Sequence, residues 1–518
     1  MPHKDSDVLQ TDSKYVPRFR RLNLQVRSRF LRVLISAGGV SLVVQAVALV
    51  RQLLIAAWFG VSRQIDIYVM AYTLATLVVF TFANIFDSVA VPHLVRLRER
   101  EGIEAARALA ATLVRGSLVL GLAATVLLLV GTFLLTPIIA TGFSTDERAE
   151  LARLMWSFVP WTLICLPYYA HVAWYKAQWR FGHAFTADIV VVLVSVGVLV
   201  LWHGSIAAIP IAYAAGYAAG LTQLAVAARL WRHQKVQPPS RAVFRNVGEL
   251  YLANQSGGVA SLVDRHIQSY VPVGGIGAIN YAAQIINTLA VFLTFREIFV
   301  VPLAQQEDRA LRLERLICGL VLVSVPTTAL VMCFAPDIVT VLLERGRFDQ
   351  NAAALTGVVL QISSISISLA AISTPLFRMF QIIDRIHLIY VMYFTGAATL
   401  ALFGYIFVGI LHLGVPGVAW MQVSSGAVGF IVLVQLVEFC GIHVRWSHVA
   451  RYFLIALAAA GIAYAAGKVA ASPFENSWLR LICGGTAFGL VVAATYFCMR
   501  SRVYPVAFGT KITPGPIA

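Results

Sequence analysis

Long apolar runs, separated by short polar segments, repeat along almost the whole chain of 518 residues. A helix needs about 20 predominantly apolar residues to cross the hydrocarbon core of a bilayer. Runs of this length predict membrane-spanning helices. We place fourteen of them, at 33–59, 65–95, 108–140, 151–175, 184–202, 206–229, 246–272, 277–305, 316–335, 352–377, 386–411, 415–440, 451–470 and 479–499.

Composition strengthens this prediction. The chain is 59% hydrophobic and only 12% charged, whereas soluble proteins average about 25% charged residues. We therefore expect an all-α polytopic membrane protein. The first 32 residues are polar and basic and lack the apolar core of a secretory signal peptide, so we expect the first helix to be retained as an uncleaved anchor.

The formal net charge of +16 is distributed unevenly across the predicted spans. Of the 40 Lys and Arg residues, 29 lie at or near the side that holds both termini and 7 at or near the opposite side, with the remaining 4 inside spans. The positive-inside rule places the basic side, and both termini, in the cytoplasm of an inner-membrane protein. The charge is thus a topology signal and argues against a nucleic-acid partner. The basic tails also suit contact with anionic membrane lipid.

Several short segments recur at an offset of about 200 residues, the spacing expected of a duplicated half. The pairs are VAVPHLVRLRERE (89–101) with FVVPLAQQEDRA (299–310), WYKAQWRFGHAF (174–185) with LFRMFQIIDRIHL (376–388), and GFSTDE (142–147) with GRFDQ (346–350). They predict two six-helix lobes in a parallel repeat, followed by two extra helices. Coincidence among hydrophobic helices is the alternative. The expected organisation is a basic tail (1–32), an N-lobe (33–230), a cytoplasmic linker (231–245), a C-lobe (246–440), two further helices (441–500) and a cytoplasmic tail (501–518).

Polar residues are concentrated on single faces of the first two helices of each lobe, because positions three, four and seven apart share a helix face. These stripes hold Gly38, Ser41, Gln45 and Gln52 with Arg51 at the flank; Asp66, Thr73, Asn84, Asp87 and Ser88; Asn254, Gly257, Gly258, Ser261, Arg265 and Gln268 with Asp264 at the edge; and Asn280, Gln284, Asn287 and Thr294. Opposed to one another, the four stripes would line a water-filled cavity between the lobes.

Arg51 needs such a cavity, because an arginine in hydrocarbon costs about 2.5–3.5 kcal/mol even on the mild insertion scale. We expect it to face the cavity, with Asp66, Asp87 or Asp264 as partners. Two alternatives remain open: Arg51 extends to the outer membrane interface, or the stripes form hydrogen bonds within a packed bundle. Arg296 and its neighbour Glu297 are expected to be a structural pair or an interface feature.

The chain carries no sequence motif for enzyme chemistry. GxxxxGK[ST], HExxH and GxSxG are absent from it. The six cysteines lie mostly inside apolar runs and form no CxxC pair. We therefore predict a transporter without ATPase, metal or cofactor, driven by a proton or cation gradient or by the membrane potential.

Several segments, in order, resemble the MurJ/MviN family of lipid-linked oligosaccharide flippases, which belongs to the multidrug/oligosaccharidyl-lipid/polysaccharide exporter superfamily. They span about residues 33 to 440. The segments are ALVRQLLIAAWFGVSRQIDIYVMAY (48–72), SVAVPHL (88–94), LVDRHIQSYVPVGGIGAINYA (262–282), LLERGRFD (342–349), LFRMFQIIDR (376–385) and LGVPGVAW (413–420). The resemblance implies fourteen spans, cytoplasmic termini, and a cavity formed by helices 1, 2, 7 and 8.

The cavity arginines of lipid II flippases are mostly missing from this chain. Gln45, Val78, Val79, Ala283 and Gln284 stand where the resemblance places further charged residues. Only Arg51 and Asp66 match the family motif. Arg265 is an added base, in a VDR motif similar to the branch associated with exopolysaccharide export. Amides suit sugar hydroxyls, and one or two arginines still suit a diphosphate.

The resemblance and the polar stripes together predict a flippase that moves an undecaprenyl-diphosphate-linked oligosaccharide, an exopolysaccharide repeat unit, from the inner to the outer leaflet. Its partners would be that glycan, membrane lipid, and a glycan polymerase or glycosyltransferases. The alternatives are a divergent lipid II flippase, a cation-coupled multidrug exporter, and a glycan polymerase or ligase, although the last would need large outer loops. The predicted substrate-binding residues are Arg51, Arg265, Asp66, Gln45, Gln284, Asn280, Asn287, Asp264 and Asp87.

Overall fold

The computed structural model describes residues 43–232, 257–294, 309–383, 385 and 387–499. Within these ranges all regular secondary structure is helical, apart from one isolated β-bridge that joins Arg345 to Phe348 in a loop. Nine helices there are long and apolar enough to cross a membrane, or ten if one bent pair is a single span. The chain is thus a multi-pass, all-α membrane protein. Parts of the predicted spans 33–59, 246–272 and 277–305 lie outside the described residues.

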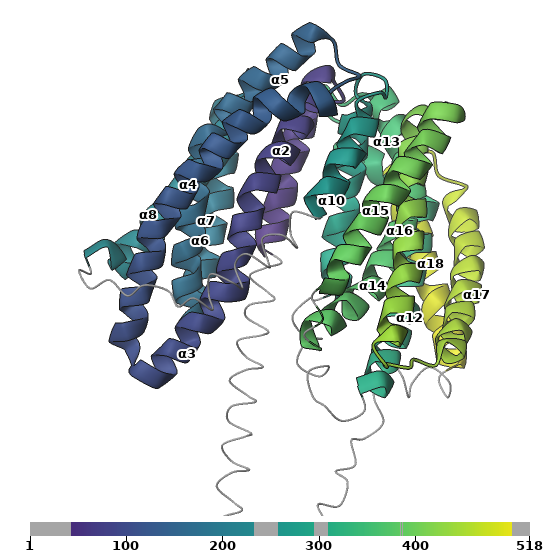
Figure 1. Cartoon of the computed structure of the whole chain (residues 1–518). Coiled ribbons are helices and arrows are strands. Elements are labelled where there is room, and N and C mark those ends of the chain that lie inside the picture. Colours follow the sequence, from purple (N-terminus) through teal and green to yellow (C-terminus); the bar gives the residue numbers. More distant parts are fainter. Residues whose placement is uncertain (1–42, 233–256, 295–308, 384, 386, 500–518) are drawn as a thin grey trace, which may run out of the picture.

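The helices of residues 43–232 form one group, the N-terminal group (Figure 1). It consists of the helix Val43–Phe59, α2 (Arg63–Ile85), the π-helix η1 (Phe86–Ala90), α3 (Val91–Glu101), α4 (Ile103–Ile139), α5 (Thr145–Ser157), α6 (Val159–Ala177), α7 (Phe181–Leu201), α8 (Ala208–Ala228) and the short η2 (Leu230–Arg232). The predicted runs 108–140, 184–202 and 206–229 begin and end within a few residues of α4, α7 and α8. The start of the run 33–59 lies outside the described residues.

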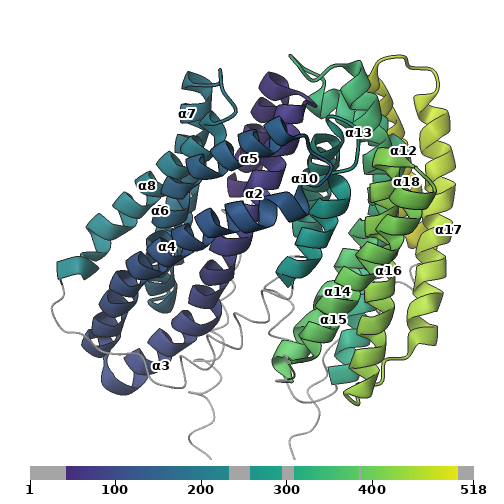
Figure 2. The same ribbon diagram turned by 45° about the horizontal axis from the view of Figure 1, so that its top comes forward.

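The helices of residues 257–499 form the C-terminal group. It consists of a helix at 257–268, α10 (Gly275–Thr294), α12 (Arg309–Leu343), α13 (Gln350–Ser363), α14 (Ile365–Ile382), α15 (His387–Gly404), the π-helix η3 (Tyr405–Ile410), α16 (Gly414–Phe439), α17 (Trp446–Ala471) and α18 (Ser477–Cys498). Figure 2 shows α17 and α18 on the side of this group that faces away from the N-terminal group.

The span predicted at 65–95 is not one straight helix. After α2 the chain makes the π-helical turn Phe86–Ala90 and then begins α3, whose first turn contains Pro92. Proline has no N–H to donate and its ring clashes with the carbonyl four residues earlier. The helix adjusts to this by widening for one turn, a common cause of bends.

Polar side chains fix where several helices begin. Ser62 accepts a hydrogen bond from Ile65 N at the start of α2, and Asp349 Oδ1 accepts one from Ala352 N at the start of α13. Ser144 and Glu147 form a capping box at the start of α5. Each cap satisfies backbone N–H groups that a first helical turn leaves free, so these short polar segments stop one helix and start the next.

The two groups share one apolar core at one end of the molecule and have separate cores elsewhere. The shared core joins Ile55, Phe59 and Tyr68 of the N-terminal group with Tyr281 and Phe348 of the C-terminal group. We call this the closed end, comprising residues 60–66, 141–147, 269–277 and 345–349. Toward the other end, one core lies within α3, α4 and α6–α8 and another within α12 and α14–α17.

The last two helices are attached to α12 through Phe334. This side chain is buried at a kink in α12 and lies against two glycines, one on α17 and one on α18. A Cβ added at Gly484 would come within 2.5 Å of the Phe334 ring, and one added at Gly467 within 3.3 Å. Beyond this contact Arg480 of α18 forms an ion pair of 3.3 Å with the buried Asp337.

Candidate functional site

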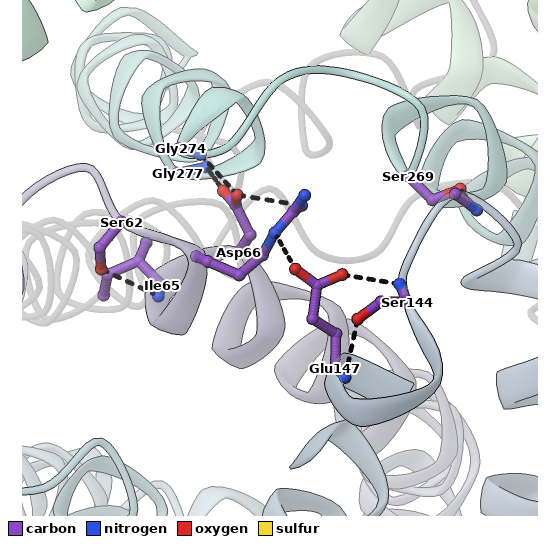
Figure 3. A network of polar contacts seen from close by, with 10 residues as sticks. Ser62, Ile65, Asp66, Ser144, Glu147, Ser269, Gly274 and Gly277 are labelled. Atoms are coloured by element: carbon purple, nitrogen blue, oxygen red, sulfur yellow. Dashed lines mark hydrogen bonds and ion pairs between the residues drawn. The ribbon is translucent and has the colours of Figure 1, made fainter. Parts of the chain in front are cut away.

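Asp66 joins the two groups at the closed end. Its side chain is fully buried, and its Oδ2 and Oδ1 atoms accept hydrogen bonds from the backbone amides of Gly274 (2.6 Å) and Gly277 (2.8 Å) (Figure 3). Gly277 is in the first turn of α10 and Gly274 directly precedes it, at the helix end where N–H groups are unpaired and the helix dipole is positive. Asp66 of one group is therefore the N-terminal cap of a helix in the other.

A short ionic chain extends from this cap to α5. Arg63 lies 3.5 Å from Asp66 through Nη1 and 2.8 Å from Glu147 through Nε, and its guanidinium stacks 4.8 Å above the ring of Phe143. Glu147 in turn accepts a hydrogen bond from the backbone amide of Ser144 (Figure 3). The negative charge of Asp66 is thus compensated within its own group as well as by α10.

The FGVSRQID and LLERGRFD segments also meet at the closed end. Arg347 N donates to Ala57 O (2.8 Å), and Tyr281 Oη donates to Gly60 O (3.2 Å). Gly60 and Gly346 both have positive φ, and a Cβ added to either would lie 2.4 Å from a backbone oxygen across the seam. Only glycine fits such positions, so these motifs form a backbone-to-backbone contact between the groups.

A matching contact joins the loop after α4 to the turn that follows the helix at 257–268. Gly142 N donates to Ser269 Oγ (3.1 Å), and a Cβ on Gly142 would lie 2.2 Å from Ser269 O. Thr141 Oγ1 donates to Tyr270 Oη (2.9 Å). The GFSTDE loop of the N-terminal group therefore contacts the C-terminal group, just as the GRFD loop contacts the N-terminal group.

Arg51 is buried inside the N-terminal group, with 9% of its surface exposed. Its guanidinium lies 4.3 Å above the ring of Tyr213. That ring belongs to an aromatic cluster whose members touch one another, namely Tyr68, Tyr72, Phe158, Trp161, Tyr213 and Tyr217. A desolvated cation–π contact is worth about 2 kcal/mol, which offsets much of the cost of about 2.5–3.5 kcal/mol for arginine in a membrane.

The expected carboxylate partners of Arg51 are occupied elsewhere in this conformation. Asp66 caps α10, Asp87 pairs with Lys176 (2.8 and 2.9 Å), and Asp264 accepts hydrogen bonds from Gln422 (3.2 Å to each oxygen). That part of the prediction is wrong here, because aromatic rings rather than an acid compensate the arginine. The Nε atom of Arg51 has no hydrogen-bond partner within the described residues.

Arg265 crosses from the C-terminal to the N-terminal group. Its Nε donates to Thr73 Oγ1 on α2 (2.9 Å), while Nη1 donates to Gln268 Oε1 on its own helix. The Thr73 hydroxyl in turn donates a hydrogen bond to Val69 O (2.8 Å). Gln268 is fully buried and its Nε2 has no partner among the residues described. The partner of this charge in the other group is therefore a neutral hydroxyl.

The remaining predicted site residues are amides with varied exposure. Gln45, Asn280 and Gln284 are partly buried, and Asn287 is exposed. Within the part of the chain that the structure describes, none of these four side chains forms a hydrogen bond between the groups. Asn254, Gly38, Ser41 and the side chains of Asn84 and Thr294 lie outside the described residues. No set of three potential metal ligands occurs in the described ranges.

The family model described as lipid II flippase MurJ matches residues 55–480. The chain belongs to the MurJ family. It is therefore a transporter rather than an enzyme, and its family moves lipid-linked oligosaccharides. The resemblance is confirmed at this level for the segments from residue 55 to LGVPGVAW, and Arg51 precedes the matched region.

Solved structures agree on the fold. A lipid II flippase MurJ in an inward closed conformation is 15% identical, with a TM-score of 0.72 over 90% of this chain and 100% of that one. An inward-facing multidrug resistance MATE family transporter is 13% identical, with a TM-score of 0.63 over 78% of this chain and 98% of that one. No curated protein matches the sequence.

Sequence reasoning missed Arg63 and Gly274, which make contacts at or across the seam between the groups. Thr73 is on a predicted polar stripe, but its contact with Arg265 was not predicted. The aromatic cluster around Arg51 had a readable signal, because Tyr68 and Tyr72, like Tyr213 and Tyr217, are four residues apart and share a helix face.

Proposed function

We propose that this protein moves an undecaprenyl-diphosphate-linked oligosaccharide, of the exopolysaccharide repeat-unit type, from the inner to the outer leaflet by alternating access. One observation carries the proposal. Within the described residues, neither Arg51 nor Arg265 forms an ion pair with a carboxylate: Arg51 stacks on Tyr213, and Arg265 donates to Thr73 and Gln268. Guanidinium groups held by rings, a hydroxyl and an amide can still bind the two negative centres of a diphosphate.

The proposal includes fourteen spans in two six-helix lobes, at 33–230 and 246–440, followed by two extra helices. The reciprocal contacts of Gly142 and Gly346 support a parallel repeat, because corresponding loops of the two lobes each contact the other lobe. The charge distribution supports cytoplasmic termini and a closed end that faces outside. The conformation would then be closed to the outside and ready to accept substrate from the cytoplasmic leaflet.

The amides support a sugar-bearing substrate. Gln45 and Gln284 stand at positions where lipid II flippases are expected to carry charged residues, and Asn280 and Asn287 extend the same helix as Gln284. Amide groups both donate and accept hydrogen bonds, as sugar hydroxyls require. Asp66, Asp87 and Asp264 complete the proposed site by holding helices and their charges in place, and a proton, cation or potential gradient would drive the cycle.

A divergent lipid II flippase is the second candidate, favoured by the family model that covers residues 55–480. Genetics separates the two. Deletion of this gene should abolish a surface polysaccharide and leave viability intact. The host's lipid II flippase should not restore the polysaccharide. Growth of a strain depleted of that flippase, sustained by this protein alone, would overturn the polysaccharide assignment in favour of lipid II.

A further inference from the structure

A second site lies on the seam between the groups, near the closed end. It is a cavity of about 790 Å³ with walls from four elements. Leu135 and Ile138 come from the last turns of α4, Leu262 from the helix at 257–268, and Ala401 and Val408 from α15 and η3. The residues proposed to bind the glycan do not line it.

The surroundings of this groove are those of a lipid-facing surface. Leu134 and Ile138 on α4, and Tyr405 and Ile410 on η3, are each more than half exposed. All four lie on helices that are long and apolar enough to span a membrane. Soluble proteins rarely leave so much apolar surface uncovered, so in the bilayer hydrocarbon covers this face and reaches the groove.

Polar groups occur at the closed-end mouth of the groove. Tyr270 accepts a hydrogen bond from Thr141, so its own hydroxyl hydrogen is left to donate. His266 lies one turn below, and its Nδ1 is 2.8 Å from Ile138 O, which can only accept, so Nδ1 carries the hydrogen. His412 lines the same mouth and is exposed. An apolar groove with hydrogen-bonding groups at one end matches an amphiphile.

We propose that the groove binds one membrane phospholipid, with an acyl chain between α4 and η3 and its phosphate against Tyr270 and His412. Cavities of about 300–1,000 Å³ enclose ligands of drug-like size, so 790 Å³ suits a single acyl chain rather than a far longer polyprenyl chain. On the orientation expected from charge, this lipid belongs to the outer leaflet.

Binding of this lipid depends on conformation. α4 belongs to the N-terminal group and the other walls belong to the C-terminal group, so separating the groups at the closed end divides the groove. A ligand stabilises the state that it binds. Phospholipid in the groove therefore favours the conformation described here, whatever glycan the protein carries.

Photo-crosslinking tests the site without measuring transport. The full-length protein would be placed in vesicles of phosphatidylethanolamine and phosphatidylglycerol that contain a phosphatidylglycerol with a diazirine in its acyl chain. We expect crosslinks in peptides covering 258–270 and 400–412. Ala401→Trp fills the groove and should reduce this labelling at least fivefold, whereas the neighbouring exposed Leu402, which does not line the groove, supplies the control Leu402→Trp.

Two further arms decide the occupant and its state dependence. Replacing the probe by a diazirine diacylglycerol, which has no phosphate, should weaken labelling in the wild type but make little difference in His412→Ala. The site would be overturned if both probes labelled the wild type and His412→Ala equally. It would also be overturned if Ala401→Trp and Leu402→Trp were labelled equally. Displacement of the probe by undecaprenyl phosphate at equal mole fraction would overturn the assignment to phospholipid.

Discussion

The carboxylate of Asp66 lies 2.6 Å from the backbone amide of Gly274, a residue 208 positions away in the other group of helices. The family motif thus places an acid opposite a helix N-terminus rather than opposite an arginine. Because both oxygens are used, the cap fixes the position of α10 relative to α2 at the closed end.

Removing this cap should open the closed end. Asp66→Ala deletes two charge-assisted hydrogen bonds, each worth about 1.5–3 kcal/mol, and each 1.4 kcal/mol shifts an equilibrium about tenfold. We expect Cys at position 269, where Ser269 is 1% exposed, to react with an impermeant thiol reagent at least ten times faster in Asp66→Ala. Asp66→Asn keeps one acceptor and should be intermediate.

The matched control for that experiment is Asp146→Ala, which removes an exposed acid from the same end of the molecule. It should leave the reaction rate at position 269 unchanged. Equal rates in Asp66→Ala and in the parent protein would refute the assignment of Asp66 as a closing contact.

Gly346→Ala should prevent the seam from closing. The added Cβ would lie 2.4 Å from Ala57 O, and the residue has φ of +58°. Gly414→Ala separates these two effects, since Gly414 has φ of +60° and open space around it. We expect export to be lost in Gly346→Ala at normal membrane abundance and largely retained in Gly414→Ala. Similar export by both variants would show that close approach is unimportant.

Arg51→Ala and Arg265→Ala should each reduce export sharply, with protein levels unchanged. Loss of a charge-assisted bond of about 1.5–3 kcal/mol corresponds to a roughly ten- to hundredfold weaker affinity for substrate. Lys keeps the charge but not the planar fork, so the Lys variants should fall between. Binding of the lipid-linked glycan and membrane abundance would be measured side by side.

Thr73→Val tests whether Arg265 contacts substrate or only holds two helices together. It removes the hydroxyl that accepts from Arg265 and leaves the guanidinium in place. If Arg265 acts on substrate, Thr73→Val should export far better than Arg265→Ala. If the two variants are equally impaired, Arg265 serves to hold the groups together.

Gly484→Leu should loosen the last two helices. The new side chain would occupy the space of the Phe334 ring, which is 2.5 Å from the added Cβ. We expect a lower melting temperature in detergent and faster proteolysis between α17 and α18. Gly485→Leu is the control, because nothing lies within 4 Å of a Cβ at that position. A melting temperature unaffected by Gly484→Leu would contradict the role of this contact.

The apolar runs predicted helix positions well, because membrane helices are fixed by a single requirement for length and hydrophobicity. The runs 108–140 and 415–440, for example, correspond to Ile103–Ile139 and Gly414–Phe439. The π-helical turn at 86–90 was missed, since the effect of Pro92 on the preceding turn depends on how the helix relaxes.

The polar faces predicted which residues share a side of a helix but not what each one touches. Asp66 and Thr73 lie on one stripe, yet Asp66 caps α10 and Thr73 accepts from Arg265. Helical periodicity does not say where along the membrane normal a neighbouring helix begins, so it could not place the start of α10 next to Asp66. It also favoured an acid as the partner of Arg51, because aromatic rings count as apolar in such patterns.

The seam at the closed end depends on buried carbonyls, amides and a helix cap more than on exposed ion pairs. Dissolved ions screen surface charges over about 8–10 Å at physiological ionic strength but affect buried contacts far less. The ease with which this end opens should therefore vary little with the salinity of the surrounding medium. A protein whose closed end faces outside would then keep the same resting state in fresh water and in brine.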